Sequence, residues 1–366
     1  MNRLSAIDAF APAFARVKAM LFRPFRLGTW LKIGLIGLLG GAVVSGGGGS
    51  NFRAPVMPRN VPHDDLPHNV DDILRAIRSI HLADYFHTFV IVIAVIVALA
   101  LIFLYLFCRF RFILFDAVVT GRTEIARGWK KYESQAGRYF EFWLIYKLVA
   151  WGALVLVVGV PLWKAYKNGL FSGDNSLPMF FAIIASVALG VLAVTIAFAI
   201  VSTLAKDFIM PVMAIDDLSV GDAWRAVWRV AASEPGAWAA YMGMKLLCAI
   251  GASIALSIAF VIALLPALLL IGIPVGILVA LGIAAFKFIG AAAGIIICCI
   301  AALLAAAGFC CLLLILTAPI SVFFTSYALY FFGGRYPKLT ALLWPQPVPP
   351  SPISPIAGVQ PVPQGQ

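Results

Sequence analysis

The sequence predicts an all-α integral membrane protein with about six transmembrane helices. Apolar residues make up 63% of the 366 residues and charged residues only 12%, whereas soluble domains contain roughly 45–50% and 25%. Several apolar runs are at least as long as the roughly 18 residues that indicate a transmembrane helix. The mean hydropathy of the chain is +1.00. Together these observations exclude a soluble globular enzyme.

Four apolar runs and one long apolar block give the order of the predicted spans. The runs lie near residues 27–45, 88–108, 141–162 and 179–203. The block covers 237–332, contains Lys245 and Lys287 as its only charged residues, and has room for two or four crossings. Prolines and glycines cluster near 264–285, which predicts a re-entrant segment there. We expect two crossings in the block in addition to that segment.

The basic residues predict the orientation of these spans. The formal net charge is +11, but the bases lie in short segments beside apolar runs, which favours anionic lipid headgroups over nucleic acid as their partner. The segments on one side of the membrane carry 18 lysines and arginines, and those on the other side carry six. Positively charged loops stay inside. The sequence therefore predicts that both termini lie in the cytoplasm.

An internal repeat is the most informative pattern. In each copy a short amphipathic helix is followed by a helix breaker, aromatic residues and a lysine near the start of the next span. The copies cover about 5–119, 120–217 and 218–332, so each unit is an in-plane helix plus a transmembrane hairpin. In the first copy the apolar stripe is Ile7, Phe10, Phe14, Val17 and Leu21.

Local patterns predict the roles of several residues in these units. Ser5 with Asp8, and Ser219 with Asp222, have the spacing of capping boxes. The lysines at equivalent positions are expected to extend along the spans to the headgroups; they are Lys32, Lys147 and Lys245. Aromatic side chains prefer the headgroup level, and the predicted membrane-interface residues are Phe10, Phe14, Trp30, Trp129, Trp143, Trp224, Trp228 and Trp238.

Two segments lie outside the predicted spans. The tail 333–366 is rich in proline and is expected to be cytoplasmic, which leaves 1–332 as the membrane domain. The exterior loop 46–87 contains all four histidines. On a helix, His81, Asp84 and His87 would share one face and are candidate ligands for a divalent metal. The sequence favours the alternative, a polar helix surface without a ligand, and it predicts no cofactor.

Lys287 is the charged residue that is hardest to place. It lies either at the exterior end of a long hairpin, close to water, or beside a cavity next to 264–285. The first reading is the more economical, because a lysine near water carries no desolvation cost. In the second reading Lys287 would line a solute pathway.

Several stretches resemble a known kind of protein. The residues 6–10, 24–32 and 207–211, followed by Asp222-Ala223-Trp224, resemble an uncharacterised family of prokaryotic polytopic membrane proteins. The helix-plus-hairpin pattern is also distantly similar to the membrane domain of glycerophosphodiester phosphodiesterases. The resemblance covers 1–340, and its motifs are architectural. It supplies no catalytic residue, and the chain lacks the soluble phosphodiesterase barrel.

The sequence therefore favours a non-enzymatic membrane protein that organises lipid or a partner protein at the cytoplasmic membrane. The alternative is a transporter or channel for a small or lipidic solute. An enzyme is third, because no catalytic motif is legible. Membrane lipids are the expected partners, together with a candidate protein partner, and the sequence leaves the ligand and the oligomeric state open.

Overall fold

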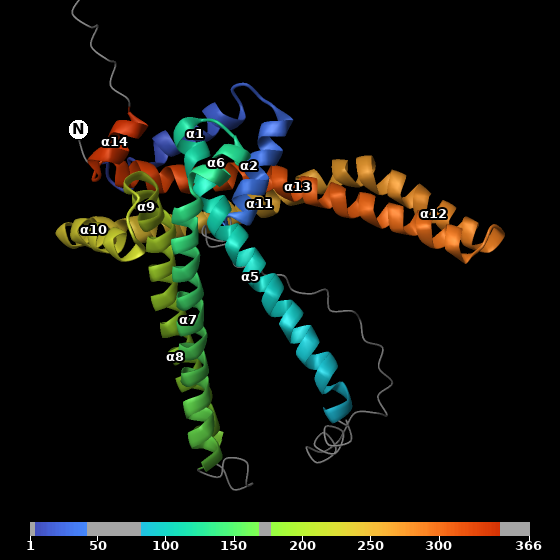
Figure 1. Cartoon of the computed structure of the whole chain (residues 1–366), viewed down its shortest axis with the longest axis horizontal. Helices are drawn as coiled ribbons and strands as arrows, with labels where there is room; N and C mark the ends of the chain where they lie inside the picture. The colour runs from blue at the N-terminus through green and yellow to red at the C-terminus, as the bar shows by residue number, and fades with distance from the viewer. Residues whose placement is uncertain (1–3, 42–81, 168–176, 345–366) are drawn as a thin grey trace, which may run out of the picture.

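The fold is known from a computed structural model, which describes residues 4–41, 82–167 and 177–344. Within the last two ranges the side chains are described from residues 87 and 180 onward. These residues form helices and no β-strand, so the predicted all-α class is confirmed. In chain order (Figure 1) the helices are α1 (Phe10–Leu21), α2 (Leu27–Leu39), α5 (Leu82–Thr120), α6 (Ile125–Lys131), α7 (Glu133–Lys167), α8 (Leu177–Leu204), the π-helix η2 (Ala205–Ile209), α9 (Met210–Asp216), α10 (Val220–Ser233), α11 (Pro235–Ala267), the π-helix η3 (Leu268–Gly272), α12 (Ile273–Phe288), α13 (Ala291–Gly333) and α14 (Pro337–Leu343).

Five helical stretches in the described residues are long and apolar enough to cross a membrane. They are His87–Thr120, Glu133–Lys167, Phe180–Asp216, Pro235–Phe288 and Ala291–Gly333. The first predicted span corresponds to α2, whose 13 residues give a helix about 20 Å long. The hydrocarbon core of a bilayer is about 30 Å thick, so α2 as described is too short to cross it perpendicularly. The predicted count of six is not confirmed.

The predicted re-entrant segment at 264–285 is not confirmed either. The chain continues as a helix from α11 through η3 into α12, and it reverses only near Gly290, which has a φ of 136°. Pro266 and Pro274 lie within this stretch. A proline removes one backbone donor, and a π-helical turn absorbs such a defect without ending the helix.

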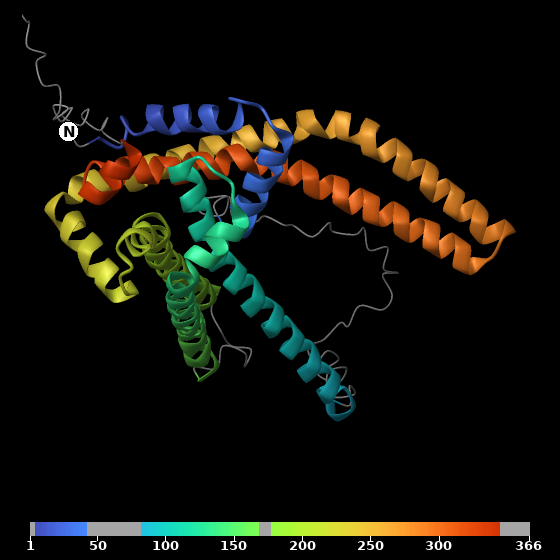
Figure 2. The same cartoon turned by 45° about the horizontal axis from the view of Figure 1, so that its top comes forward.

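The molecule divides into a packed core and three apolar arms (Figures 1 and 2). The first arm is the amino-terminal half of α5, and the second is the hairpin of α7 and α8. The third, which we call the long hairpin, is formed by α11 and α12 together with α13. They leave the core in different directions in both views. Only 0–6% of the residues in the most apolar window of each span are buried within the protein. Few residues of the arms are therefore fully enclosed by the rest of the protein.

The core forms where helix ends from all parts of the chain meet. Its closest ring contacts join Phe208 to Trp238, with centroids 4.5 Å apart, and Tyr241 to Phe331, at 4.6 Å. Aromatic pairs at such separations add to the stabilisation from burial. The largest fully buried side chains include Tyr139, Tyr241, Tyr327, Phe112, Phe208, Phe331 and Phe332.

Of the two predicted helix starts, the one at Ser219 is confirmed: Ser219 is the N-cap of α10, and its Oγ accepts from the Asp222 N–H at 3.2 Å. The Asp8 N–H donates to Ser5 Oγ at 3.1 Å, but this pair lies in a turn before α1, whose N-cap is Ala9. In α10 the serine satisfies a backbone donor that the first turn of the helix leaves unpaired. These contacts depend only on residues three apart, which is why the sequence reveals them.

The predicted tail begins inside the core. α14 packs against the end of α13, and Leu339 is fully buried. Lys338 and Tyr336 both bind the carboxylate of Asp216. The described part of the tail, up to residue 344, thus belongs to the packed core, and 345–366 lie outside the described residues.

Close approach of α2 and α13 gives the first prediction. A Cβ at Gly34 would lie 2.1 Å from the main-chain oxygen of Leu314, whereas a Cβ at Gly28, also in α2, would meet nothing within 4 Å. We expect Gly34→Ala to lower the free energy of unfolding by about 1–3 kcal/mol, because the two backbones must separate. Gly28→Ala should be neutral or slightly stabilising, because alanine is the better helix former.

Thermal unfolding of the two purified variants in detergent checks this expectation. Equal melting temperatures for Gly34→Ala and Gly28→Ala would contradict the observed contact between α2 and α13.

Candidate functional site

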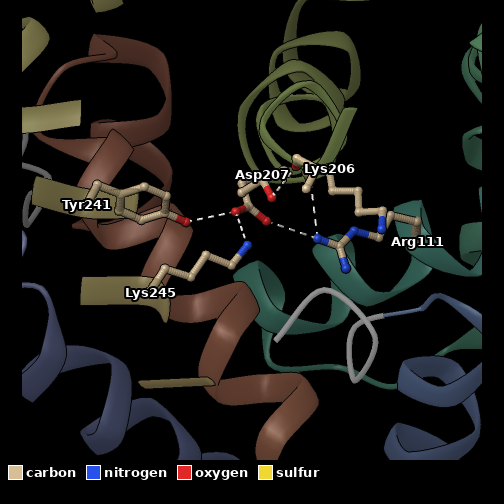
Figure 3. A network of polar contacts seen from close by, with 7 residues as sticks. Arg111, Lys206, Asp207, Tyr241 and Lys245 are labelled. Carbon is tan, nitrogen blue, oxygen red and sulfur yellow. Dashed lines mark hydrogen bonds and ion pairs between the residues drawn. The ribbon is translucent and has the colours of Figure 1, made fainter. Parts of the chain in front are cut away.

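Charged side chains from three distant parts of the chain meet inside the core (Figure 3). Arg111 comes from α5, Asp207 from η2, and Tyr241 and Lys245 from α11. These helices belong to the first, second and third predicted repeat units respectively. We call this cluster, together with Lys206, the charged junction.

The Asp207 carboxylate is the centre of the junction. Its Oδ1 accepts from Arg111 Nη2 at 3.3 Å, and its Oδ2 accepts from the Tyr241 hydroxyl at 2.8 Å and from Lys245 Nζ. Arg111 Nη2 also donates to the main-chain oxygen of Lys206 at 3.2 Å. Asp207 is 3% exposed and Arg111 is 2% exposed. A fully buried carboxylate is stable only when its lone pairs are satisfied in this way.

The π-helix η2 places Asp207 in this position. Pro211 has no N–H, so it cannot donate to the carbonyl four residues earlier. The neighbouring Met210 N–H instead donates to Ala205, five residues back, which widens the turn. π-helical turns are often found at functional sites.

Positive charge exceeds negative charge at the junction. Arg111 and Lys245 bind the single carboxylate of Asp207, and the Lys206 side chain extends beside Arg111. Two nitrogens of Arg111, Nε and Nη1, are buried and have no hydrogen-bond partner among the described residues. The junction therefore retains donor capacity that Asp207 does not use.

A row of cations and one indole connects the junction with the surface. Lys206 is half-buried, and its Nζ lies 5.3 Å from the centroid of the Trp143 ring. Lys147, which is exposed, lies 5.9 Å from the same ring. Both distances fit cation–π contacts.

A second polar group lines a cavity of about 550 Å³ between α5, α6, α9 and α14. There Asp116 accepts from Lys131 Nζ at 2.7 Å and from the Tyr132 hydroxyl at 2.9 Å. Burial opposes the charged form of Lys131, but the hydrogen bonds to Asp116 and Tyr132 outweigh it and raise the pKa of Lys131. Burial, aided by Asp116, raises the pKa of Tyr132 to about 12. Each lysine at this cavity, Lys131 and Lys338, is already paired with an aspartate.

Residues 10–27 comprise α1, its connection to α2 and the first residue of α2, and we call this segment the elbow. It exposes large apolar side chains beside cations. Trp30 closes it, because its indole N–H donates to the Leu21 carbonyl at 2.7 Å. The rings of Phe22 and Phe25 pack against Trp30 at 5.2 and 5.6 Å. The residues that the elbow exposes are Phe14, Phe22, Phe25 and Leu27 and the cations Lys18, Arg23 and Arg26.

The predicted stripe of α1 divides between two environments. Val17 and Leu21 are buried, but Ile7, Phe10 and Phe14 are exposed, with Phe14 at 60%. The buried face of α1 consists of Ala13, Val17 and Leu21 and is continued before the helix by Ala9, since α1 lies directly on α13. Ala9 and Ala13 permit that close approach near the start of the helix, and the rings of Phe10 and Phe14 remain on the outer face.

The predicted membrane-interface aromatics likewise lie in different places. Trp30, Trp143 and Trp238 are buried in the core, where they pack against other rings. Trp129 and Trp224 are partly buried against the core, and Arg109 lies over Trp129 at 4.9 Å. The exposed ones are Phe10, Phe14 and Trp228.

Lys245 does not extend to the headgroups as predicted. It is buried and bound to Asp207, because a carboxylate in the core satisfies its charge. The residues next to Lys245 and Asp207 in the sequence do not show that these two side chains pair. The signal that could have shown it is that an acid and a base each lie at the end of an apolar run, where each needs a partner.

Two other predicted site features remain untested. Lys287 lies in the last turn of α12, exposed at the tip of the long hairpin, where it lines an apolar pocket of about 410 Å³. Of the candidate metal ligands, His81 and the side chain of Asp84 lie outside the described residues, so the metal site stays a prediction.

The five apolar helices define the class of this chain as a multi-pass membrane protein. The chain belongs to DUF7544, a family of unknown function whose sequence profile matches residues 4–342. No curated protein and no solved structure matches it. These comparisons show no link to glycerophosphodiester phosphodiesterases, so that distant resemblance stays a prediction.

Proposed function

We propose that this protein is a non-enzymatic organiser of lipid at the inner face of a prokaryotic cytoplasmic membrane. The observation that carries the proposal is the elbow, which exposes aromatic rings beside Lys18, Arg23 and Arg26. An apolar face edged by cations is the pattern of a segment that lies in the headgroup region of an anionic leaflet.

The three arms are also suited to a lipid environment. Large apolar side chains are exposed along the described parts of all three arms, and contact with water would be strongly unfavourable over so large an area. Hydrocarbon is the surrounding that removes this cost. Because little packing fixes the arms beyond the core, we expect them to swing toward a common direction in a bilayer.

Of the three predicted in-plane helices, the one in the elbow is the best candidate for contact with lipid. In α6, Gly128 lies against Ile113 and Trp129 packs under Arg109. α10 presents Trp228 outward, but its Ala223 and Val227 are buried. In the elbow, several exposed aromatic rings lie near three exposed cations, Lys18, Arg23 and Arg26.

A transporter for a small or lipidic solute remains the second candidate, and the apolar pocket beside Lys287 is the observation that favours it. It predicts solute flux in proteoliposomes that Lys287→Ala abolishes.

Lipid selectivity tests the main proposal. Spin-labelled phosphatidylglycerol and phosphatidylcholine are compared in proteoliposomes, and the motionally restricted fraction of each is measured. We expect the wild-type protein to restrict more phosphatidylglycerol. The triple variant Lys18→Gln, Arg23→Gln and Arg26→Gln should lose most of this preference, since each cation near a surface contributes about 1 kcal/mol.

A matched control keeps the net charge of the triple variant. It carries Arg122→Gln, Arg127→Gln and Lys130→Gln, which are exposed positions in and before α6. We expect it to retain the lipid preference. If the two triple variants lose the same amount, the elbow has no special role and the proposal fails.

A further inference from the structure

We propose that the charged junction binds the phosphate group of an anionic ligand between Arg111 and Lys206. The inference goes beyond the proposed function, because it concerns a buried site and not the exposed elbow. A phospholipid headgroup and free phosphate share the chemistry that the site would recognise.

The excess of donors is the first argument. Asp207 Oδ1 accepts from Arg111 Nη2, and Asp207 Oδ2 accepts from Lys245 and from the Tyr241 hydroxyl. Arg111 Nε and Nη1 have no acceptor among the described side chains and backbone. Leaving buried donors unpaired costs free energy, and a phosphate offers several strong acceptor oxygens.

The excess of charge is the second argument. Arg111 binds the Asp207 carboxylate, the Lys206 side chain extends beside Arg111, and a monoanionic or dianionic phosphate between them would reduce the repulsion of these two cations. Arginine suits this role because its charge and planar donors persist in a buried site.

A route to the site is the third argument. The Lys206 side chain extends beside Arg111 (Figure 3) and is half-buried. It is long and flexible, so it can move to admit a ligand and then act as a point charge. The exposed Lys147, on the other side of Trp143, lies at the outer end of this route.

Ligand-induced thermal stabilisation of the full-length protein in detergent tests the inference. Two probes are used: inorganic phosphate and dihexanoyl phosphatidic acid. Lys206→Gln removes one cation without breaking a bond to Asp207. Arg111→Lys keeps a cation for Asp207 but removes the spare donors. Lys32→Gln is the control, because Lys32 is an exposed lysine of α2 outside the charged junction.

We expect at least one probe to stabilise the wild-type protein and Lys32→Gln equally. Lys206→Gln should weaken the apparent affinity about tenfold or more, as expected for loss of a charged contact. Arg111→Lys should weaken the apparent affinity as well, measured relative to the melting temperature of the same variant without ligand. Stabilisation by phosphatidic acid alone identifies a lipid headgroup, and equal stabilisation by phosphate identifies a free anion.

The inference is overturned if neither probe stabilises the wild-type protein, or if Lys206→Gln and Lys32→Gln respond alike. Both results are independent of the lipid preference of the elbow, so each proposal can fail alone.

Discussion

Asp207→Asn is expected to lower the free energy of unfolding by about 3–5 kcal/mol, the usual cost of removing one partner from a buried ion pair. Arg111 and Lys245 would remain buried without the carboxylate that both bind. Because these residues come from three helices, the loss should separate the ends of α5, η2 and α11. Titration with denaturing detergent in mixed micelles measures the change.

Two further variants establish the cause. Glu124→Gln removes an exposed carboxylate that lies 3.8 Å from Arg127, and we expect a change of at most about 0.5 kcal/mol. Adding Lys245→Met to Asp207→Asn should recover part of the loss, since it removes one of the two buried cations that Asp207 binds. A double variant that is less stable than Asp207→Asn would show that charge at Lys245 is not the reason.

Arg335→Ala is expected to have the next largest effect, a loss of about 2–3 kcal/mol. Arg335 Nε donates to Glu234 at 3.1 Å, and its Nη1 donates to the main-chain oxygens of Leu4 and Phe331 at 3.0 and 2.8 Å. Hydrogen bonds of charged donors contribute about 1.5–3 kcal/mol. The side chain thus joins the start of the chain to the α10–α11 turn and the end of α13.

The control for Arg335→Ala is Arg225→Ala, whose side chain is exposed and pairs with Asp222 one turn away. We expect a change within about 0.5 kcal/mol, because exposed ion pairs contribute little. Equal melting temperatures for the two alanine variants would contradict the linking role of Arg335.

Features set by near neighbours could be predicted from the sequence. The capping contacts of Ser5 and Ser219 join residues three apart. The apolar runs near 88–108, 141–162 and 179–203 and the block 237–332 predicted helices of membrane-spanning length, and the structure has such helices there. The prolines near 264–285 favoured a re-entrant segment that is not confirmed, since one lost hydrogen bond does not end a helix that a π-turn can continue.

The charged junction could not be predicted, because its partners are far apart. Arg111 and Asp207 are 96 residues apart, and Asp207 and Lys245 are 38 apart. Taken alone, each of these residues is explained as a charge in a cytoplasmic segment or as a lysine that reaches the headgroups, so none of them indicates a distant partner. The two faces of α1 could not be told apart for the same reason. Three- and four-residue spacing fits both the face of Ala13, Val17 and Leu21 and the face of Phe10 and Phe14, and the contact with α13 decides that the first is buried.

Accessibility of the arms tests the central claim, that lipid covers them. Spin labels at Val97, Leu156 and Ile262, one on each arm and each exposed in the protein, are examined in lipid nanodiscs with oxygen and with a water-soluble nickel chelate as relaxing agents. The account predicts that oxygen reaches all three labels far better than the chelate does. Greater access for the chelate, or exclusion of both agents by a protein partner, would contradict it.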